Sequence, residues 1–251
     1  MKRALAVLSL LLLTGCFEVE QSIDLERNLS GKAGFRLGVD LEPMVVVMAR
    51  FARVMDWKSG PMSAEELAKA KAEFKKSSSN VKEKLSRADI EAQLPEGVTL
   101  LDFAIDERDF GVVSDFRFGF ERISQLVGVK LPSKGKKPTD RTIIDSPFEG
   151  LEVSESANTI TIRSKPQNPP EAVKAEAGDL ELDEATKQIV RDAFGKMRVA
   201  YRITAPFEVV SHNATRRDGK TLVWEYDLRT LEEMMKSKSV DAAQLRVTYR
   251  R

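Results

Sequence analysis

The stretch that decides the fold is Phe17 to Leu41, FEVEQSIDLERNLSGKAGFRLGVDL. Apolar and polar residues alternate on both sides of its middle, and a period of two is typical of strands with one buried face. The middle, Asn28 to Lys32, has turn-forming composition, and Gly31 is free to adopt a positive φ. Strands joined by so short a turn are antiparallel neighbours. Residues 17–41 therefore predict a β-hairpin.

The segment before this hairpin has the features of a secretory signal. Two basic residues, Lys2 and Arg3, precede an apolar run from Ala4 to Leu13. A run of about ten residues is too short to cross a bilayer, which takes about 20. The residues that end this segment, Leu13-Thr14-Gly15-Cys16, are similar to the lipobox of bacterial lipoproteins.

The lipobox resemblance implies that residues 1–15 are a signal peptide, cleaved after Gly15, and that Cys16 carries acyl chains such as palmitate. The protein would then be anchored to the cell membrane or the outer membrane and exposed outside the cytoplasm. An ordinary signal peptide followed by a chance cysteine is the alternative. Because Cys16 is the only cysteine, no internal disulfide can form, and stability has to come from the core.

The composition is that of a globular protein with balanced charge. Apolar residues make up 42% of the chain, and residues 16–251 suffice for a single α+β lipoprotein domain. Without Lys2 and Arg3, the 40 basic residues become 38, against 39 acidic ones. Nucleic acid is therefore not predicted as a partner, since its binding calls for a basic excess. The predicted partners are the membrane, through Cys16, and a lipid-like ligand or an envelope protein.

The period changes after the hairpin, and residues 43–95 predict a helical insertion. The segment Met44 to Met55 is apolar on most of its circumference, which favours a buried core helix. A lid over an apolar cavity or a membrane-surface helix is the functional alternative. Charged helices are expected over 64–76, behind a capping box of Ser63 and Glu66, and over 81–94.

A second predicted hairpin, Val98 to Ile105 and Val112 to Phe120, has a strongly aromatic face. Such a face lines either a core or an apolar pocket, and the apolar helix before it is a partner of matching character. The candidate face for a core or for an apolar ligand combines residues of both segments: Met44, Val47, Met48, Phe51, Met55, Phe116, Phe118 and Phe120.

The remaining segments predict more hairpins. Strands are expected at 148–153, 159–163, 197–204, 207–213, 221–226 and 245–249, with an Asp-Gly turn joining 207–213 to 221–226. A linker is expected over 166–178, a helix over 183–194 and a basic loop over 130–141. The turns between strands are short, so the predicted fold class is α+β, with a mainly antiparallel sheet and a helical insertion after the first hairpin.

The last third of the chain resembles a known family. Residues 205–214, Ala-Pro-Phe-Glu-Val-Val-Ser-His-Asn-Ala, and 218–224, Asp-Gly-Lys-Thr-Leu-Val-Trp, are similar to the C-terminal hairpin of LppM-type bacterial lipoproteins. That family shows a proline-led strand, a polar corner, an Asp-Gly turn and a strand carrying tryptophan. The resemblance implies an envelope lipoprotein with an LppM-like α+β domain on a curved antiparallel sheet, and lipid binding as its role.

The residues offer little for catalysis. His212 is the only histidine, and the chain has no Gly-x-Ser-x-Gly elbow and no phosphate-binding glycine loop. A single histidine and one acylated cysteine cannot complete a zinc site. We therefore predict no enzyme, no catalytic residue, no metal and no cofactor, and expect a hydrogen-bonded structural role for His212.

Two functions remain open from the sequence, and both are non-enzymatic. One is a membrane-anchored lipoprotein that binds an amphiphilic or lipid-like ligand. The other is a scaffold that recruits a protein partner to the membrane surface. A hydrolase of unrecognised type is the outside alternative.

Overall fold

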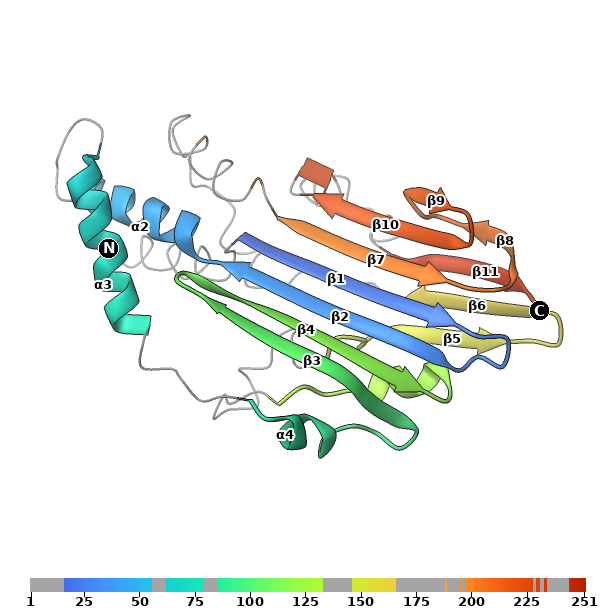
Figure 1. The fold of residues 1–251 in the computed structure, drawn as a ribbon. Coiled ribbons are helices and arrows are strands. Elements are labelled where there is room, and N and C mark those ends of the chain that lie inside the picture. The colour runs from blue at the N-terminus through green and yellow to red at the C-terminus, as the bar shows by residue number, and fades with distance from the viewer. Residues whose placement is uncertain are drawn as a thin grey trace.

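The chain forms two β-sheets, and helices α2 and α3 lie beyond one end of the larger sheet (Figure 1). The computed structural model describes residues 16–55, 62–78, 85–132, 146–165, 188, 195, 197–227, 229–230, 233 and 244–251. A seven-stranded sheet has the order β3-β4-β2-β1-β7-β10-β9, and a four-stranded sheet has the order β5-β6-β11-β8. The predicted α+β class, with helices after the first hairpin, is confirmed.

The bounds of the elements are as follows. The large sheet contains β1 (Cys16–Leu25), β2 (Gly31–Asp40), β3 (Val98–Arg108), β4 (Gly111–Phe120), β7 (Arg198–Thr204), β9 (Arg216–Asp218) and β10 (Thr221–Asp227). The small sheet contains β5 (Leu151–Glu155), β6 (Thr159–Ser164), β8 (Glu208–His212) and β11 (Arg246–Arg250). The helices are α2 (Glu42–Met55), α3 (Ala64–Ser78), α4 (Arg87–Glu91) and the 3₁₀-helix η1 (Ile123–Gly128).

Pairing within the sheets is mainly antiparallel, as predicted. β1 pairs antiparallel with β2 from Cys16 opposite Asp40 to Leu25 opposite Gly31, so the first predicted hairpin is present over its full length. The parallel pair that the structure shows joins β1 to β7, with Glu18 opposite Arg198. A parallel pair needs a long crossover, and here the two strands are separated by most of the chain.

The core lies between the two sheets. Every second residue of the central strands points toward it, which is the consequence of the period-two pattern. One cluster takes buried side chains from both sheets, among them Ile23, Phe35, Phe118, Ile203 and Trp224 of the large sheet and Ile160, Ile162, Val247 and Tyr249 of the small one. The two sheets therefore stabilise each other by burying their facing sides.

The turn of the first hairpin differs in detail from its prediction. The positive φ is adopted by Leu29, at 67°, whereas Gly31 is almost fully extended. Gly31 is required for a different reason, because a Cβ there would lie 1.9 Å from the carbonyl oxygen of Asp24. The glycine thus permits close approach of the two strands where the turn ends.

Of the helices predicted after the first hairpin, the last is shorter than expected. α3 begins behind the expected capping box: the Glu66 amide donates to Ser63 Oγ (3.1 Å), and the Ser63 amide donates to Glu66 Oε2 (2.9 Å). The expected helix over 81–94 is wrong in length, since the structure has α4 over Arg87–Glu91 alone and describes nothing of 79–84. A second capping box, of Ser86 and Asp89, fixes that late start.

The predicted hairpin of 207–213 with 221–226 is also wrong. β8 pairs with β11 in the small sheet, and β10 lies in the large sheet between β7 and β9. The Asp-Gly turn is present, with Gly219 at φ 59°, but it joins β9 to β10. The chain changes sheets after Ala205, where Pro206 has no amide hydrogen with which to continue the ladder.

Several predicted features lie outside the described residues. They are the signal segment 1–15, most of the basic loop 130–141, the linker 166–178, and the helix 183–194 apart from Gln188. Within the residues that the structure does describe, no helix is long and apolar enough to cross a membrane.

Candidate functional site

The end of the large sheet that carries Cys16 brings together the segments that the sequence singled out. β1 starts at Cys16, which lies opposite Asp40, and Asp40 in turn lies opposite Gly111 at the start of β4. The β3–β4 turn, Asp109 and Phe110, is at the same end. α2 and α3 follow directly from β2 and project beyond the strands (Figure 1). We call this end of the sheet the Cys16 end.

α2 does not cover the Phe116–Phe118–Phe120 face as we expected. Met44, Val45 and Val47 are buried, but none belongs to the cluster between the sheets. Met48 is half-buried, and the side chains of Phe51 and Met55 are outside the described ones. α2 packs against α3 instead, because the chain continues past the end of β2 without turning back over the sheet.

The three phenylalanines of β4 belong to the core. Phe116, Phe118 and Phe120 are 3%, 0% and 5% exposed. The Phe118 ring stacks on Phe116 at 6.4 Å between centroids and meets Phe148 edge-on at 6.2 Å. Among the candidate residues whose side chains the structure describes, a core group on β4 is therefore separate from a helical group on α2.

Burial along the inner face of the large sheet decreases toward the Cys16 end. Beneath the small sheet the inward side chains are closed off from solvent, whereas those near Cys16 are half-buried, and Ile105 is 38% exposed. The strand registers place these residues side by side on one face. We call this group the inner apolar strip; it consists of Phe17, Val39, Phe103, Ile105 and Val112.

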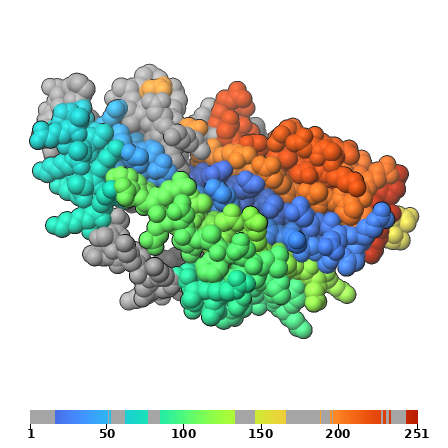
Figure 2. All heavy atoms as spheres, viewed as in Figure 1, coloured from blue at the N-terminus to red at the C-terminus, as the bar shows by residue number. Residues whose placement is uncertain are grey.

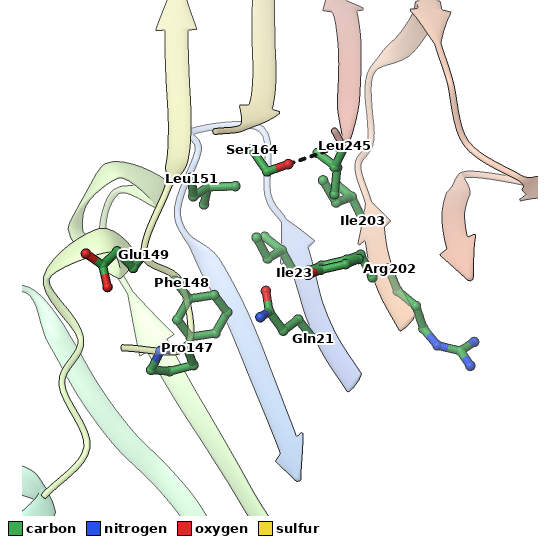
Figure 3. Close-up of a pocket in the computed structure, with 11 residues that line it drawn as sticks. Gln21, Ile23, Pro147, Phe148, Glu149, Leu151, Ser164, Arg202, Ile203 and Leu245 are labelled. Carbon is green, nitrogen blue, oxygen red and sulfur yellow. Dashed lines mark hydrogen bonds between the residues drawn. The ribbon is translucent and has the colours of Figure 1, made fainter. Parts of the chain in front are cut away.

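The cavity between the two sheets is too small for a lipid chain (Figure 3). Its volume is about 30 Å³, and Gln21, Ile23, Phe148, Leu151 and Leu245 are among the residues that line it. A space of that size holds about one water molecule. Ser164 Oγ at its wall accepts a hydrogen bond from the Leu245 amide (2.9 Å), and the Arg202 side chain points away from it.

α3 is held to the Cys16 end by aromatic and charged contacts. The rings of Phe74 and Phe110 stack with centroids 6.3 Å apart. The ammonium group of Lys75 lies 5.1 Å from the Phe110 centroid and donates to Asp109 Oδ2 (2.6 Å). Lys71 forms an ion pair with Glu42 at the start of α2. These contacts join α2, α3 and the β3–β4 turn into one layer.

The outer face of the large sheet carries ion pairs that cross its strands. Arg198 donates to Glu225 and to Glu18, and these carboxylates, Glu225 first, raise the pKa of the guanidinium above its ordinary value. Arg202 Nε lies 2.8 Å from Glu20 Oε1, at an angle too poor for a hydrogen bond. We call this surface, which also contains Arg36 and Asp115, the outer ionic face.

The C-terminal motif has a structural role that the sequence did not reveal. Asn213 Oδ1 accepts from Trp224 Nε1 (2.8 Å) and from the Arg246 amide (2.9 Å). Trp224 belongs to the large sheet and Arg246 to the small one, so Asn213 ties the two sheets together. His212 is exposed, and its Nδ1 accepts from the Ala214 amide (3.1 Å). The expected hydrogen-bonded role of His212 at a corner is what the structure shows.

The three tyrosines are perturbed by burial. Desolvation raises the pKa of Tyr201, and it raises that of Tyr226, whose ring meets Tyr201 edge-on, to about 12. Burial also raises the pKa of Tyr249, whose hydroxyl has no hydrogen-bond partner among the described residues. All three phenols are held in the neutral form, which suits core residues and does not suit a general base.

The described residues offer no metal centre. Among them, no group of three or more histidine, cysteine, aspartate or glutamate side chains is placed to hold an ion.

Comparison with known proteins returned little at the level of sequence. No protein-family model matches the chain, and no curated protein matches it. Among solved structures, the chain is similar to the folded domain of the LppM protein of Mycobacterium tuberculosis, with a TM-score of 0.43 and 10% identity, over 94% of this chain and 90% of that one.

Proposed function

We propose that this chain is a lipid-anchored protein of the cell envelope that binds an amphiphilic molecule and catalyses no reaction. Anchoring is supported by the similarity of residues 13–16 to a lipobox and by the start of β1 at Cys16 itself. Ligand binding is supported by one observation: the inner apolar strip, which stays half-buried on the core side of the sheet.

The shape of the site limits the ligand. The cavity of about 30 Å³ between the sheets cannot take an acyl chain. A ligand bound at the strip therefore lies along the sheet surface, with its polar part facing solvent. Phe17, Val39 and Val112 are neighbours on three adjacent strands, which gives an apolar surface that continues across the sheet. Such a surface suits a flat or extended apolar group with a polar end.

Native mass spectrometry of the purified full chain, with two matched variants, tests this function. Ile105→Asp places a carboxylate in the strip, whereas Val210→Asp places one on β8 of the small sheet, where Val210 is 50% exposed. Both changes replace a partly exposed aliphatic side chain on a strand. We expect co-purifying lipid on the parent chain and on Val210→Asp, and several-fold less on Ile105→Asp. Equal lipid on both variants, or none on the parent, would reject binding at the strip.

A scaffold role is the second candidate, and the outer ionic face favours it. Figure 2 shows this face of the sheet open, with no described helix over it. Arg117 is 67% exposed there and lies 3.9 Å from Asp115. A scaffold would carry no lipid and would lose an envelope partner on Arg117→Glu while it keeps that partner on Ile105→Asp. Affinity capture of crosslinked partners with these two variants separates the two functions.

A further inference from the structure

If the chain is acylated, the lipid is attached at the Cys16 end of the sheet, close to α2. β1 begins at Cys16, so no tether separates the lipid from the fold. Cys16 lies opposite Asp40, and α2 begins two residues later, at Glu42. Facing residues of antiparallel strands are about 5 Å apart and each residue of a strand adds about 3.3 Å, so the lipid is attached within roughly 10–15 Å of α2.

The helices project farther than Cys16 does. α2 has 14 residues, which corresponds to a length of about 21 Å. It leaves the sheet in continuation of β2, and among the described residues α3 lies farthest out at this end (Figures 1 and 2). A molecule held by Cys16 at a membrane surface therefore brings α2 and α3 to that surface before the rest of the fold.

Two lysines of α3 are neutralised by ion pairs within this layer, which suits a surface that lies against a membrane. Lys71 is paired with Glu42, and Lys75 is paired with Asp109 while it lies over the Phe110 ring. Lysine stems beside aromatic rings are typical of residues that lie at a membrane interface with their charged ends in water. The exposed side of α3 includes two small residues, Ala68 and Ala72, between charged ones.

We propose that α2, α3 and the β3–β4 turn form the membrane-facing layer of the anchored protein, with a phospholipid bilayer as the occupant of this surface. The proposal rests on the proposed anchoring at Cys16. It assigns an orientation: the sheet stands with its Cys16 end on the bilayer, and the outer ionic face and the loop at Asn28 stay in water.

Spin labels on the full chain in vesicles of phosphatidylethanolamine and phosphatidylglycerol test this orientation. Cys16 is the only cysteine and is consumed by the lipid, so a second, introduced cysteine can be labelled alone. The labels are placed by Ala68→Cys and Ala72→Cys on α3, by Arg117→Cys on the outer ionic face and by Lys220→Cys at the β9–β10 turn. All four positions are exposed, so each substitution should leave the fold unchanged. The positions at 117 and 220 lie away from α3 and serve as controls.

For each label we measure the rate of collision with two reagents, oxygen and a nickel complex. Oxygen partitions into lipid, whereas the nickel complex stays in water. We expect labels at 68 and 72 to be several-fold less accessible to nickel in vesicles than labels at 117 and 220. Nickel accessibility at 68 and 72 equal to that at 220 would overturn the proposal, as would a lipid-exposed label at 117. Mass spectrometry of the same samples reports acylation of Cys16. An unacylated protein would refute the anchoring itself, whereas an acylated protein with water-exposed α3 labels would refute only the orientation.

Discussion

At the residue scale, Asn213 is the side chain on which the packing of the two sheets depends most visibly. Its carboxamide oxygen accepts from the Trp224 indole, which is fully buried, and from the Arg246 amide. Asn213→Ala leaves the indole donor without a partner, and an unsatisfied buried donor costs about 1–3 kcal/mol. We expect the free energy of unfolding to fall by this amount, and with it the urea midpoint. Tryptophan fluorescence and circular dichroism measure both.

Two variants control this prediction. His212→Ala removes the neighbouring exposed hydrogen bond and should change the free energy of unfolding by less than about 1 kcal/mol. Trp224→Phe combined with Asn213→Ala removes donor and acceptor together, so the double variant should lose less than the sum of the single losses. Strict additivity of the two substitutions would show that the bond contributes nothing.

The tyrosines give a second prediction at this scale. The chain has three, and burial raises the pKa of each, to about 12 for Tyr226. A raised pKa in the folded state means that stability is intact below the unfolded value, about 10, and falls as pH rises toward 12. Absorbance near 295 nm should show little phenolate in the native protein at pH 10.5, in contrast to the chain in guanidinium. Ordinary titration of the native protein near pH 10 would contradict the burial of these rings.

At the element scale, α3 is a separate layer whose attachment depends on Phe110. The Phe74 and Phe110 rings stack, and two lysines of α3 lie over Phe110. Because neither Phe74 nor Phe110 belongs to the cluster between the sheets, Phe110→Ala should release α3 without unfolding the sheets. We expect amide exchange over residues 64–78 to accelerate while the global midpoint changes little.

Phe118→Ala is the matched control for that experiment. It truncates a ring that is fully buried between the sheets, and changes of this kind cost about 3–5 kcal/mol. The global midpoint should therefore fall while the relative exchange of α3 stays unchanged. A similar fall for Phe110→Ala would mean that α3 is part of the cooperative core.

The sequence predicts elements better than it predicts their partners. The alternation in 17–41 and in 112–120 predicted β1, β2 and β4, and the Ser63–Glu66 pattern predicted the start of α3, because these signals are local. The partner of β10 and the place of α2 depend on registers between segments far apart in the chain, which local periodicity does not contain. The inner apolar strip was missed for the same reason, since its residues come together only across four strands.

At the scale of the whole molecule, the proposed lipid anchor at Cys16 would determine where the protein acts. If the lipobox interpretation is right, Cys16→Ser should abolish acylation and leave a protein that is unprocessed or no longer partitions with membranes. Firm anchoring requires more than one acyl chain, because a single chain binds only marginally. Fractionation of cells into membrane and soluble parts measures this, and unchanged partitioning of the variant would refute the lipobox interpretation.

The parallel pairing of β1 with β7 also determines the order in which the protein can fold. β1 is among the first segments made, but its second edge is completed only by Arg198–Thr204, about four-fifths of the way along the chain. Contacts between such distant segments form late and slow folding, because a long loop must close first. During synthesis the hairpin of β1 and β2 can pair early with β4, whereas the other edge of β1 stays unpaired until β7 in the last third of the chain is made. Until β7 is made, this edge of β1 has unpaired backbone groups and is open to pairing with other chains.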